Sequence, residues 1–174
     1  MAARSAHRRT KLGALGAALA IAAIAGACST GPTPSAAPAP AAQGCNGPGG
    51  PPDATTSAIF NATNASRGAS GLGGLRWDPQ LWCLASGWSR VMGDSGSMRH
   101  RDIGASLNSA EFAGYRTLGE NVLNGPAGMS GDAMHAAWMN SPAHRANILS
   151  GAFSSFAVAI YNNGQVWATE NFGG

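Results

Sequence analysis

Lysine is nearly absent from this chain of 174 residues, which contains Lys11 and no other lysine. Four of the eleven cationic side chains lie within the first eleven residues. The remainder carries seven arginines against eight acids, so its formal net charge is 7 − 8 = −1. That balance excludes an extended basic face of the kind that binds nucleic acid or an anionic membrane surface. We therefore expect no nucleic-acid partner, and the formal charge of +3 reflects a basic leader.

The apolar run from Leu12 to Ala27 is too short and too rich in Ala and Gly to form a stable membrane span. Because it follows a cationic start, it predicts an export signal peptide over residues 1–27. The pair Arg8-Arg9 leaves a twin-arginine route open beside the general secretory route. Small residues directly before Cys28 fit a peptidase site or a lipobox. We expect a cell-surface lipoprotein anchored to the membrane through lipidated Cys28, with free secretion as the alternative.

Residues 28–52 have few large apolar side chains and hold seven of the ten prolines. A segment of this composition buries too little apolar surface to offset the entropy lost on folding. We predict an extended, mobile tether that carries a folded domain at residues 53–174.

Cysteine is also scarce, with three residues and no Cys-x-x-Cys motif. No histidine lies near Cys45 or Cys83, which argues against a zinc–thiolate site. Once Cys28 is set aside, Cys45 and Cys83 form an even pair in an exported chain, and this favours a disulfide over two free thiols.

The folded domain begins with predicted helices and ends with predicted strands. Aspartate followed by proline at Asp78-Pro79 predicts a helix start, and apolar residues at three- and four-residue spacing continue to about Gly93. Ser141-Pro142 repeats this start. The other expected helices cover Asp53 to Arg67, Ser109 to Tyr115, a segment capped by Asp132, and Ala143 to Leu149.

Near the C-terminus the pattern changes to alternation over Ser154 to Tyr161. The turn Asn162-Asn163-Gly164 follows, and Gln165 to Thr169 forms the expected return strand. Helices first and an antiparallel sheet last predict an α+β fold.

Five motifs in order resemble the CAP superfamily of cysteine-rich secretory proteins, antigen 5 and pathogenesis-related 1 proteins, in its bacterial form. They are Asn64–Arg67 with Leu75–Leu81, His100, Gly119-Glu120-Asn121, Trp138–Leu149, and the final strand Trp167–Gly173. The resemblance implies a three-layer α-β-α sandwich with a small antiparallel sheet and a cleft.

The resemblance also implies that His100, Glu120 and His144 point into that cleft. Eukaryotic relatives have two His and two Glu there, and some bind a divalent metal through the His pair. Ser141 stands where the second Glu would be, which puts any activity that needs two carboxylates in doubt. Zinc or another divalent cation is therefore the cofactor implied for His100, His144 and Glu120.

The residues themselves support two roles for this set. His144 is expected near the third position of a helix, where the helix dipole favours the neutral ring that ligates zinc. Glu120 is expected either to join two imidazoles as a ligand or to hydrogen-bond one ring and fix its tautomer. The alternative is a purely structural hydrogen-bonded group. Ser141 is not expected to be a nucleophile, because a helix-capping hydroxyl bonds backbone N–H groups.

Three arginines, Arg99, Arg101 and Arg145, flank the two histidines. We expect them to be solvated or paired with Asp102, and an anionic ligand is the alternative.

The sequence favours an extracytoplasmic binding or interaction module rather than an enzyme. Its partner would be a small molecule, a lipid or a protein. A metal-dependent, peptidase-like hydrolase using His100, His144 and Glu120 is the first alternative, and lipid or sterol binding is the second.

Overall fold

The computed structural model describes residues 45–174. The predicted signal peptide 1–27, Cys28 and most of the predicted tether 28–52 lie outside the described residues. Within them, no helix is long and apolar enough to cross a membrane.

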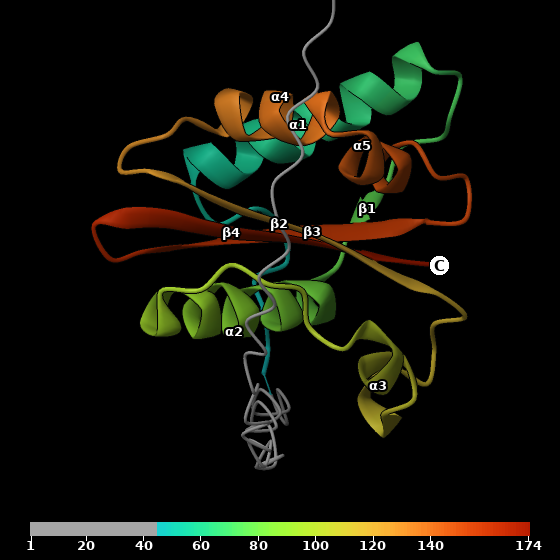
Figure 1. The fold of residues 1–174 in the computed structure, drawn as a ribbon. Coiled ribbons are helices and arrows are strands. Elements are labelled where there is room, and N and C mark those ends of the chain that lie inside the picture. Colours follow the sequence, from blue (N-terminus) through green and yellow to red (C-terminus); the bar gives the residue numbers. More distant parts are fainter. Residues whose placement is uncertain (1–44) are drawn as a thin grey trace, which may run out of the picture. The chain divides into compact units, whose positions relative to one another are not determined.

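A four-stranded sheet lies between two layers of helices (Figure 1). One layer contains α1 (Ala54–Ala69), α4 (Gly131–Asn140) and α5 (Pro142–Ile148), and the other contains α2 (Pro79–Ser95) and α3 (Ile103–Leu107). The strands are β1 (Arg76–Trp77), β2 (Leu118–Pro126), β3 (Ser155–Asn162) and β4 (Gln165–Gly173), in the spatial order β1-β3-β4-β2. The α+β sandwich fold is thus confirmed.

The first two helices begin where their capping residues predict. Asp53 and Thr56 form a capping box at the start of α1, and Asp78 accepts hydrogen bonds from the backbone N–H groups of Gln80 and Leu81 at the start of α2. The predicted end of α2 near Gly93 is slightly early. The helix continues to Ser95 and ends at Gly96, whose φ of 62° is the left-handed conformation that glycine adopts without penalty.

One predicted helix is shorter than expected, and one predicted helix cap is wrong. In place of a helix over Ser109 to Tyr115, the chain forms α3 earlier, capped by Asp102, and then only a short 3-10 helix at Ala110–Phe112. The residue that caps α4 is Ser130, whose hydroxyl accepts a hydrogen bond from Ala133 N at 3.2 Å, whereas Asp132 lies inside the helix. For α4, Ser130 and Asp132 are both residue types that cap helices, so the sequence alone did not separate them.

The predicted C-terminal hairpin is confirmed, and its return strand is longer than expected. Strands β3 and β4 are antiparallel, with Ser155 opposite Gly173 and Asn162 opposite Val166. The strand alternation does not separate buried from exposed faces, because helices cover both sides of the sheet and β3 and β4 are buried on both. Strand β2, for which no strand was predicted, pairs antiparallel with β4, and β1 adds a short parallel edge beside β3.

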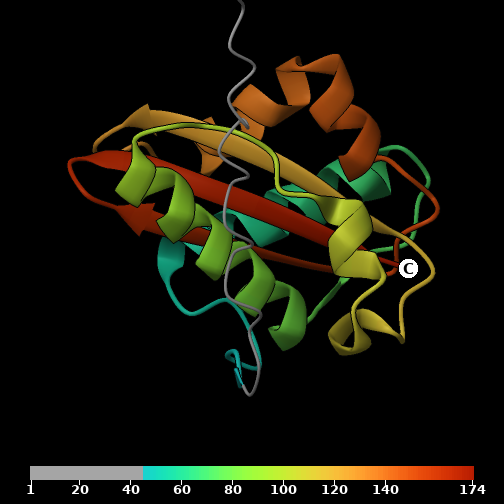
Figure 2. The same cartoon turned by 60° about the horizontal axis from the view of Figure 1, so that its bottom comes forward.

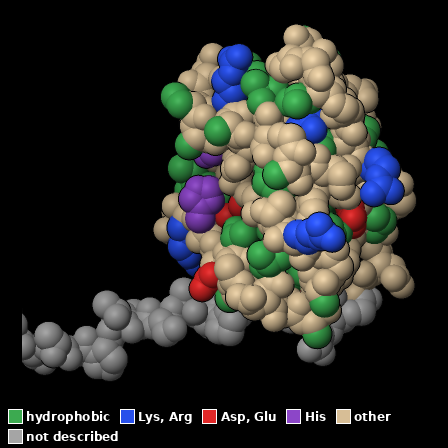
Figure 3. All heavy atoms as spheres, turned by 90° about the vertical axis from the view of Figure 1, so that its right-hand side faces the viewer, with side chains coloured by type: hydrophobic (Ala, Val, Ile, Leu, Met, Phe, Trp, Pro, Cys, Tyr) green, Lys and Arg blue, Asp and Glu red, His purple; other side chains and the backbone are tan. Residues whose placement is uncertain are grey.

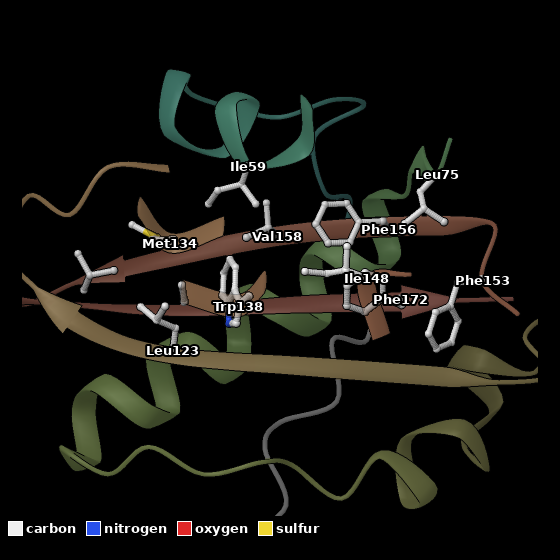
Figure 4. Packing of buried hydrophobic residues seen from close by; sticks show 12 residues of the cluster. Ile59, Leu75, Leu123, Met134, Trp138, Ile148, Phe153, Phe156, Val158 and Phe172 are labelled. Atoms are coloured by element: carbon white, nitrogen blue, oxygen red, sulfur yellow. The ribbon is translucent and has the colours of Figure 1, made fainter. Parts of the chain in front are cut away.

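The largest hydrophobic cluster fills the space between the sheet and the layer of α1, α4 and α5. Figure 4 shows Ile59 of α1 and Trp138 of α4 beside Val158 of β3, with Phe156 and Phe172 farther along the sheet. The α2 layer packs on the opposite face through Leu81, Leu84, Trp88 and Met92. Because helices cover both faces of the sheet, the packing of each strand determines which helical layer each side chain faces. The position of the candidate site follows from this packing.

The described end of the predicted tether is attached to the domain. Cys45 and Cys83 form the predicted disulfide, which joins the start of the described chain to α2 across 38 residues. In the chain-entropy description a loop of this length contributes about 4 kcal/mol to stability. The Trp77 indole N–H also donates a hydrogen bond to the Pro48 carbonyl at 2.8 Å.

Candidate functional site

The candidate site is built around β2, which lies at the edge of the sheet. Successive side chains of a strand point to opposite faces. Val122 packs with Trp88 of α2, while Leu123 belongs to the cluster under α1, α4 and α5. By the same alternation Glu120 points to the α2 side and Asn121 to the α5 side. Two consecutive residues of β2 therefore reach both helical layers.

His100 comes to Glu120 on the segment between α2 and α3. This segment runs back along α2 (Figure 2). The Trp88 indole N–H donates a hydrogen bond to the Arg99 carbonyl at 2.8 Å, which fastens the segment just before His100. His100 Nδ1 then lies 3.0 Å from Glu120 Oε1. The His100 side chain is 58% exposed, whereas that of Glu120 is 1% exposed, so the carboxyl is the buried support and the ring faces solvent.

On its buried side Glu120 contacts Arg101 twice. Its Oε1 also accepts a hydrogen bond from the Arg101 backbone N–H at 3.0 Å, and the Arg101 Nε lies 3.8 Å from Oε2. Burial raises the pKa of Glu120, and the hydrogen bonds from Arg101 and His100 and the Arg101 charge oppose that rise. A carboxylate can only accept hydrogen bonds, so with Glu120 ionised the proton is assigned to the His100 nitrogen that faces Oε1. The other ring nitrogen, Nε2, is then free to accept or to ligate.

His144 approaches the same place from α5, on the other side of the strand. It lies at the third position of α5, as predicted, and its ring centroid is 6.4 Å from that of His100. The pKa of His144 is lowered, first by burial and then by repulsion from His100. The ring is therefore the neutral form expected from the sequence, and burial is the main cause. Figure 3 shows histidine side chains reaching the surface next to acidic atoms.

The reason given against a nucleophilic Ser141 is wrong. Ser141 is the N-cap residue of α5, but among residues 45–174 its hydroxyl makes no capping hydrogen bond. The hydroxyl is therefore not occupied as the capping rule predicts.

The expected pairing of the flanking arginines with Asp102 is also wrong. Asp102 caps α3, accepting from Ala105 N at 2.8 Å. Arg101 lies at Glu120 instead and donates to the Leu84 carbonyl at 3.1 Å. Arg99 and Arg101 both lie over the Trp88 ring, with their guanidinium carbons 5.3 Å and 5.2 Å from its centroid. Only Arg145 is exposed in the manner expected.

Sequence reasoning missed the buried polar residues behind the site. Asn121 was noted only as part of a motif, and Asn147 and Glu170 were given no role. Asn121 and Glu170 are 0% exposed and hydrogen-bonded to each other, and Asn147 joins Asn121 from α5. The available signal for Glu170 was the one charged residue in the strand Val166–Phe172.

The donor set is compatible with a cation shared by two imidazoles. In residues 45–174 there is no group of three or more His, Cys, Asp or Glu side chains arranged to hold a metal ion. Two rings that bind one zinc ion with Zn–N bonds of about 2.0–2.1 Å have centroids roughly 5–6 Å apart, close to the 6.4 Å found. The two rings are thus slightly farther apart than in such a pair, and the contact of Glu120 with His100 Nδ1 suits an orienting partner rather than a third ligand.

Comparison with known proteins gives one family. A sequence model of the cysteine-rich secretory protein (CAP) family matches residues 60–172. An extracellular SCP-domain protein of Bacillus anthracis has a similar structure, with a TM-score of 0.58 and 30% identity over 68% of this chain and 39% of that one. A cysteine-rich secretory protein of Staphylococcus aureus has the same TM-score with 21% identity, over 68% of this chain and 38% of that one.

The Bacillus subtilis protein YkwD, described as uncharacterized, is 36% identical over 59 residues, which is 34% of this chain and 22% of that protein. The present chain thus spans well under half the length of these three relatives.

Proposed function

Because the chain belongs to the cysteine-rich secretory protein (CAP) family, we propose that it is an exported binding module whose ligand site is formed by His100, Glu120 and His144. The observation that carries this proposal is the approach of two imidazoles to 6.4 Å around a buried carboxyl that orients one of them. The predicted leader 1–27 and the extracellular description of the Bacillus anthracis relative support export. Lipidation of Cys28 would keep the module at the membrane surface.

A divalent cation is the ligand class that suits this donor set. With Nδ1 facing Glu120, His100 leaves Nε2 for a ligand. Burial and then repulsion from His100 lower the pKa of His144, which favours its neutral ring. Neutral imidazole nitrogens are good ligands for zinc, and water completes the coordination of a partly exposed site. A bound cation would act as a Lewis acid toward a ligand that replaces that water.

Binding is better supported than hydrolysis. A general base has to reach the water or substrate that it deprotonates. The Glu120 side chain is 1% exposed, and its Oε1 is shared by His100 and the Arg101 backbone. Ser141 stands where the family resemblance implies a second carboxylate. We therefore assign Glu120 the role of orienting His100.

Zinc titration of the full chain by isothermal calorimetry tests this proposal. We expect one zinc site in the wild type and at least a tenfold loss of affinity in His100→Ala and in His144→Ala. The Glu120→Gln variant should lose about 10- to 100-fold, the usual effect of removing the partner of a ligating histidine.

His135→Gln is the matched control. His135 is 8% exposed and hydrogen-bonded to Ser66 Oγ at 2.9 Å under α1, away from the site. Its replacement should leave zinc affinity unchanged even if it lowers stability. A wild type without zinc-dependent heat, or equal zinc affinity in the wild type and both site variants, would refute the cation site.

A further inference from the structure

A continuous set of buried hydrogen bonds lies behind the site and joins β4, β2 and α5. Asn121 Nδ2 donates to Glu170 Oε2 at 2.9 Å and to the main-chain carbonyl of His144 at 3.1 Å. Asn121 is opposite Glu170 in the strand register, so the two side chains share the face that α5 covers. A single amide thus connects the central strand to the residue that carries the second imidazole.

The second amide, Asn147, completes the connection from the side of α5. Asn147 Nδ2 donates to Asn121 Oδ1 at 2.9 Å and to the main-chain carbonyl of Glu120 at 3.1 Å. The Asn121 amide can be oriented only one way, because turning it over would place its oxygen against the His144 carbonyl and the Glu170 oxygen. Both Glu120 and His144 are therefore held through their main-chain carbonyls by the same pair of asparagines.

Helix α5 follows α4 directly, and the N–H of Ser141 between them donates to the Trp138 carbonyl at 3.1 Å. It has seven residues, too few for a helix that is stable alone, and Ile148 is its one fully buried side chain. Its N-cap hydroxyl makes no capping bond within the described chain. Its other anchor is at the far end, where Arg67 donates to the carbonyls of Ile148 and Ser150 at 2.8 Å each. Beyond its connection to α4, the first turn, which carries His144, is held to the sheet by the asparagines.

From this arrangement we infer that Asn121 and Asn147 are positioning residues that set the distance between the His144 and His100 rings, with Glu170 as the buried anchor of Asn121. The predicted effect on ligand affinity rests on the proposed function. The geometric part concerns the protein without any ligand. The two parts can therefore be tested separately.

The test compares Asn147→Ala with the control Asn124→Ala in the full chain. Asn147 is half-buried, so its side chain can be removed with little cost in packing. Asn124 lies on the same strand as Glu120 and bonds the neighbouring strand through Gln165 Oε1 and the Val166 carbonyl, each at 3.1 Å, but it is exposed and far along β2 from the site.

Histidine ring signals are recorded by NMR without metal at one fixed pH, and zinc affinity is measured by calorimetry. We expect Asn147→Ala to shift the ring signals of His144 and His100 and to weaken zinc binding about tenfold. Asn124→Ala should change neither. A role in stability alone would lower the free energy of unfolding without moving ring signals of the folded state.

Unchanged ring signals in Asn147→Ala would overturn the inference, whether or not the wild type binds zinc. Shifted ring signals in a protein that does not bind zinc would support the inference and refute the proposed function. Asn147→Ser is measured in parallel, because its hydroxyl keeps a polar group at this position if alanine does not fold. In that variant as well, unshifted His144 signals would overturn the inference.

Discussion

Glu170 is a fully buried carboxyl in the central strand, and replacing it by glutamine should change how stability depends on pH. Burial raises the pKa of Glu170 to about 8 from its ordinary value of 4.5, against the smaller opposing effect of hydrogen bonds from Asn121 and Thr63. The folded protein therefore keeps this group protonated at neutral pH, whereas the unfolded chain ionises it. Glutamine has nearly the same shape and cannot ionise.

The magnitude follows from proton linkage. Below pH 4.5 both states hold the proton and Glu170 has no effect on the pH dependence. Between pH 4.5 and about 8 the folded state binds one proton more than the unfolded state, so the free energy of unfolding falls by about 1.4 kcal/mol per pH unit. Above pH 8 the loss is complete. At pH 7 the accumulated cost is about 3 kcal/mol, which Glu170→Gln should largely remove.

Urea unfolding of the oxidised full chain at pH 5, 6, 7 and 8 measures this directly. The difference in unfolding free energy between Glu170→Gln and the wild type should grow steadily over that range. Titration of the other groups, including His135 and Glu120, occurs in both proteins and cancels in the difference. Glu111→Gln makes the same chemical change outside the core and should give a flat difference. A flat difference for Glu170→Gln too would refute the protonated buried carboxyl.

Two further pairs of variants test the packing around the sheet. Gly93→Ala should destabilise by about 1–3 kcal/mol, since a Cβ there would overlap the Tyr161 ring, whereas Gly87→Ala in the same helix meets open space and should gain about 0.5–1 kcal/mol in urea unfolding. Equal effects would contradict the close approach of α2 to Tyr161. Arg67→Lys should lose about 2–4 kcal/mol, because lysine cannot reach all the carbonyls that the guanidinium bonds, while Arg116→Lys on the surface should change stability by less than about 0.5 kcal/mol. A small loss at Arg67 would show that those carbonyls find other partners.

Local rules predicted the elements whose ends carry strong signals. The caps at Asp53 and Asp78-Pro79 and the turn before Gln165 act through bonds within a few residues, so the sequence contains the whole cause. Strand β2 was missed because Gly119, Glu120 and Asn121 have low strand propensity. That segment is a strand because β4 offers a partner over its whole length, which is a non-local cause.

The candidate site was predicted in the same uneven way. The resemblance brought His100, Glu120 and His144 together, and the structure has them close. The resemblance did not show whether Glu120 is a metal ligand or orients His100, because that depends on which side of Glu120 is buried. Asn121 and Asn147 gave no signal, since a buried amide and a surface amide look alike in sequence.

Because Glu120 and Asn121 are consecutive on β2, the candidate site depends on the register in which β2 pairs with β4. One residue orients His100 from the α2 side, and the next holds the helix that carries His144 on the other side. A strand has a side-chain period of two, so a register slip of one residue between β2 and β4 would exchange their faces. The carboxyl would then point toward Glu170 and the amide toward His100. Leu118, Val122 and Leu123 oppose this slip because each would leave its own hydrophobic cluster. Apolar packing along β2 therefore specifies the polar site as firmly as the hydrogen bonds within it.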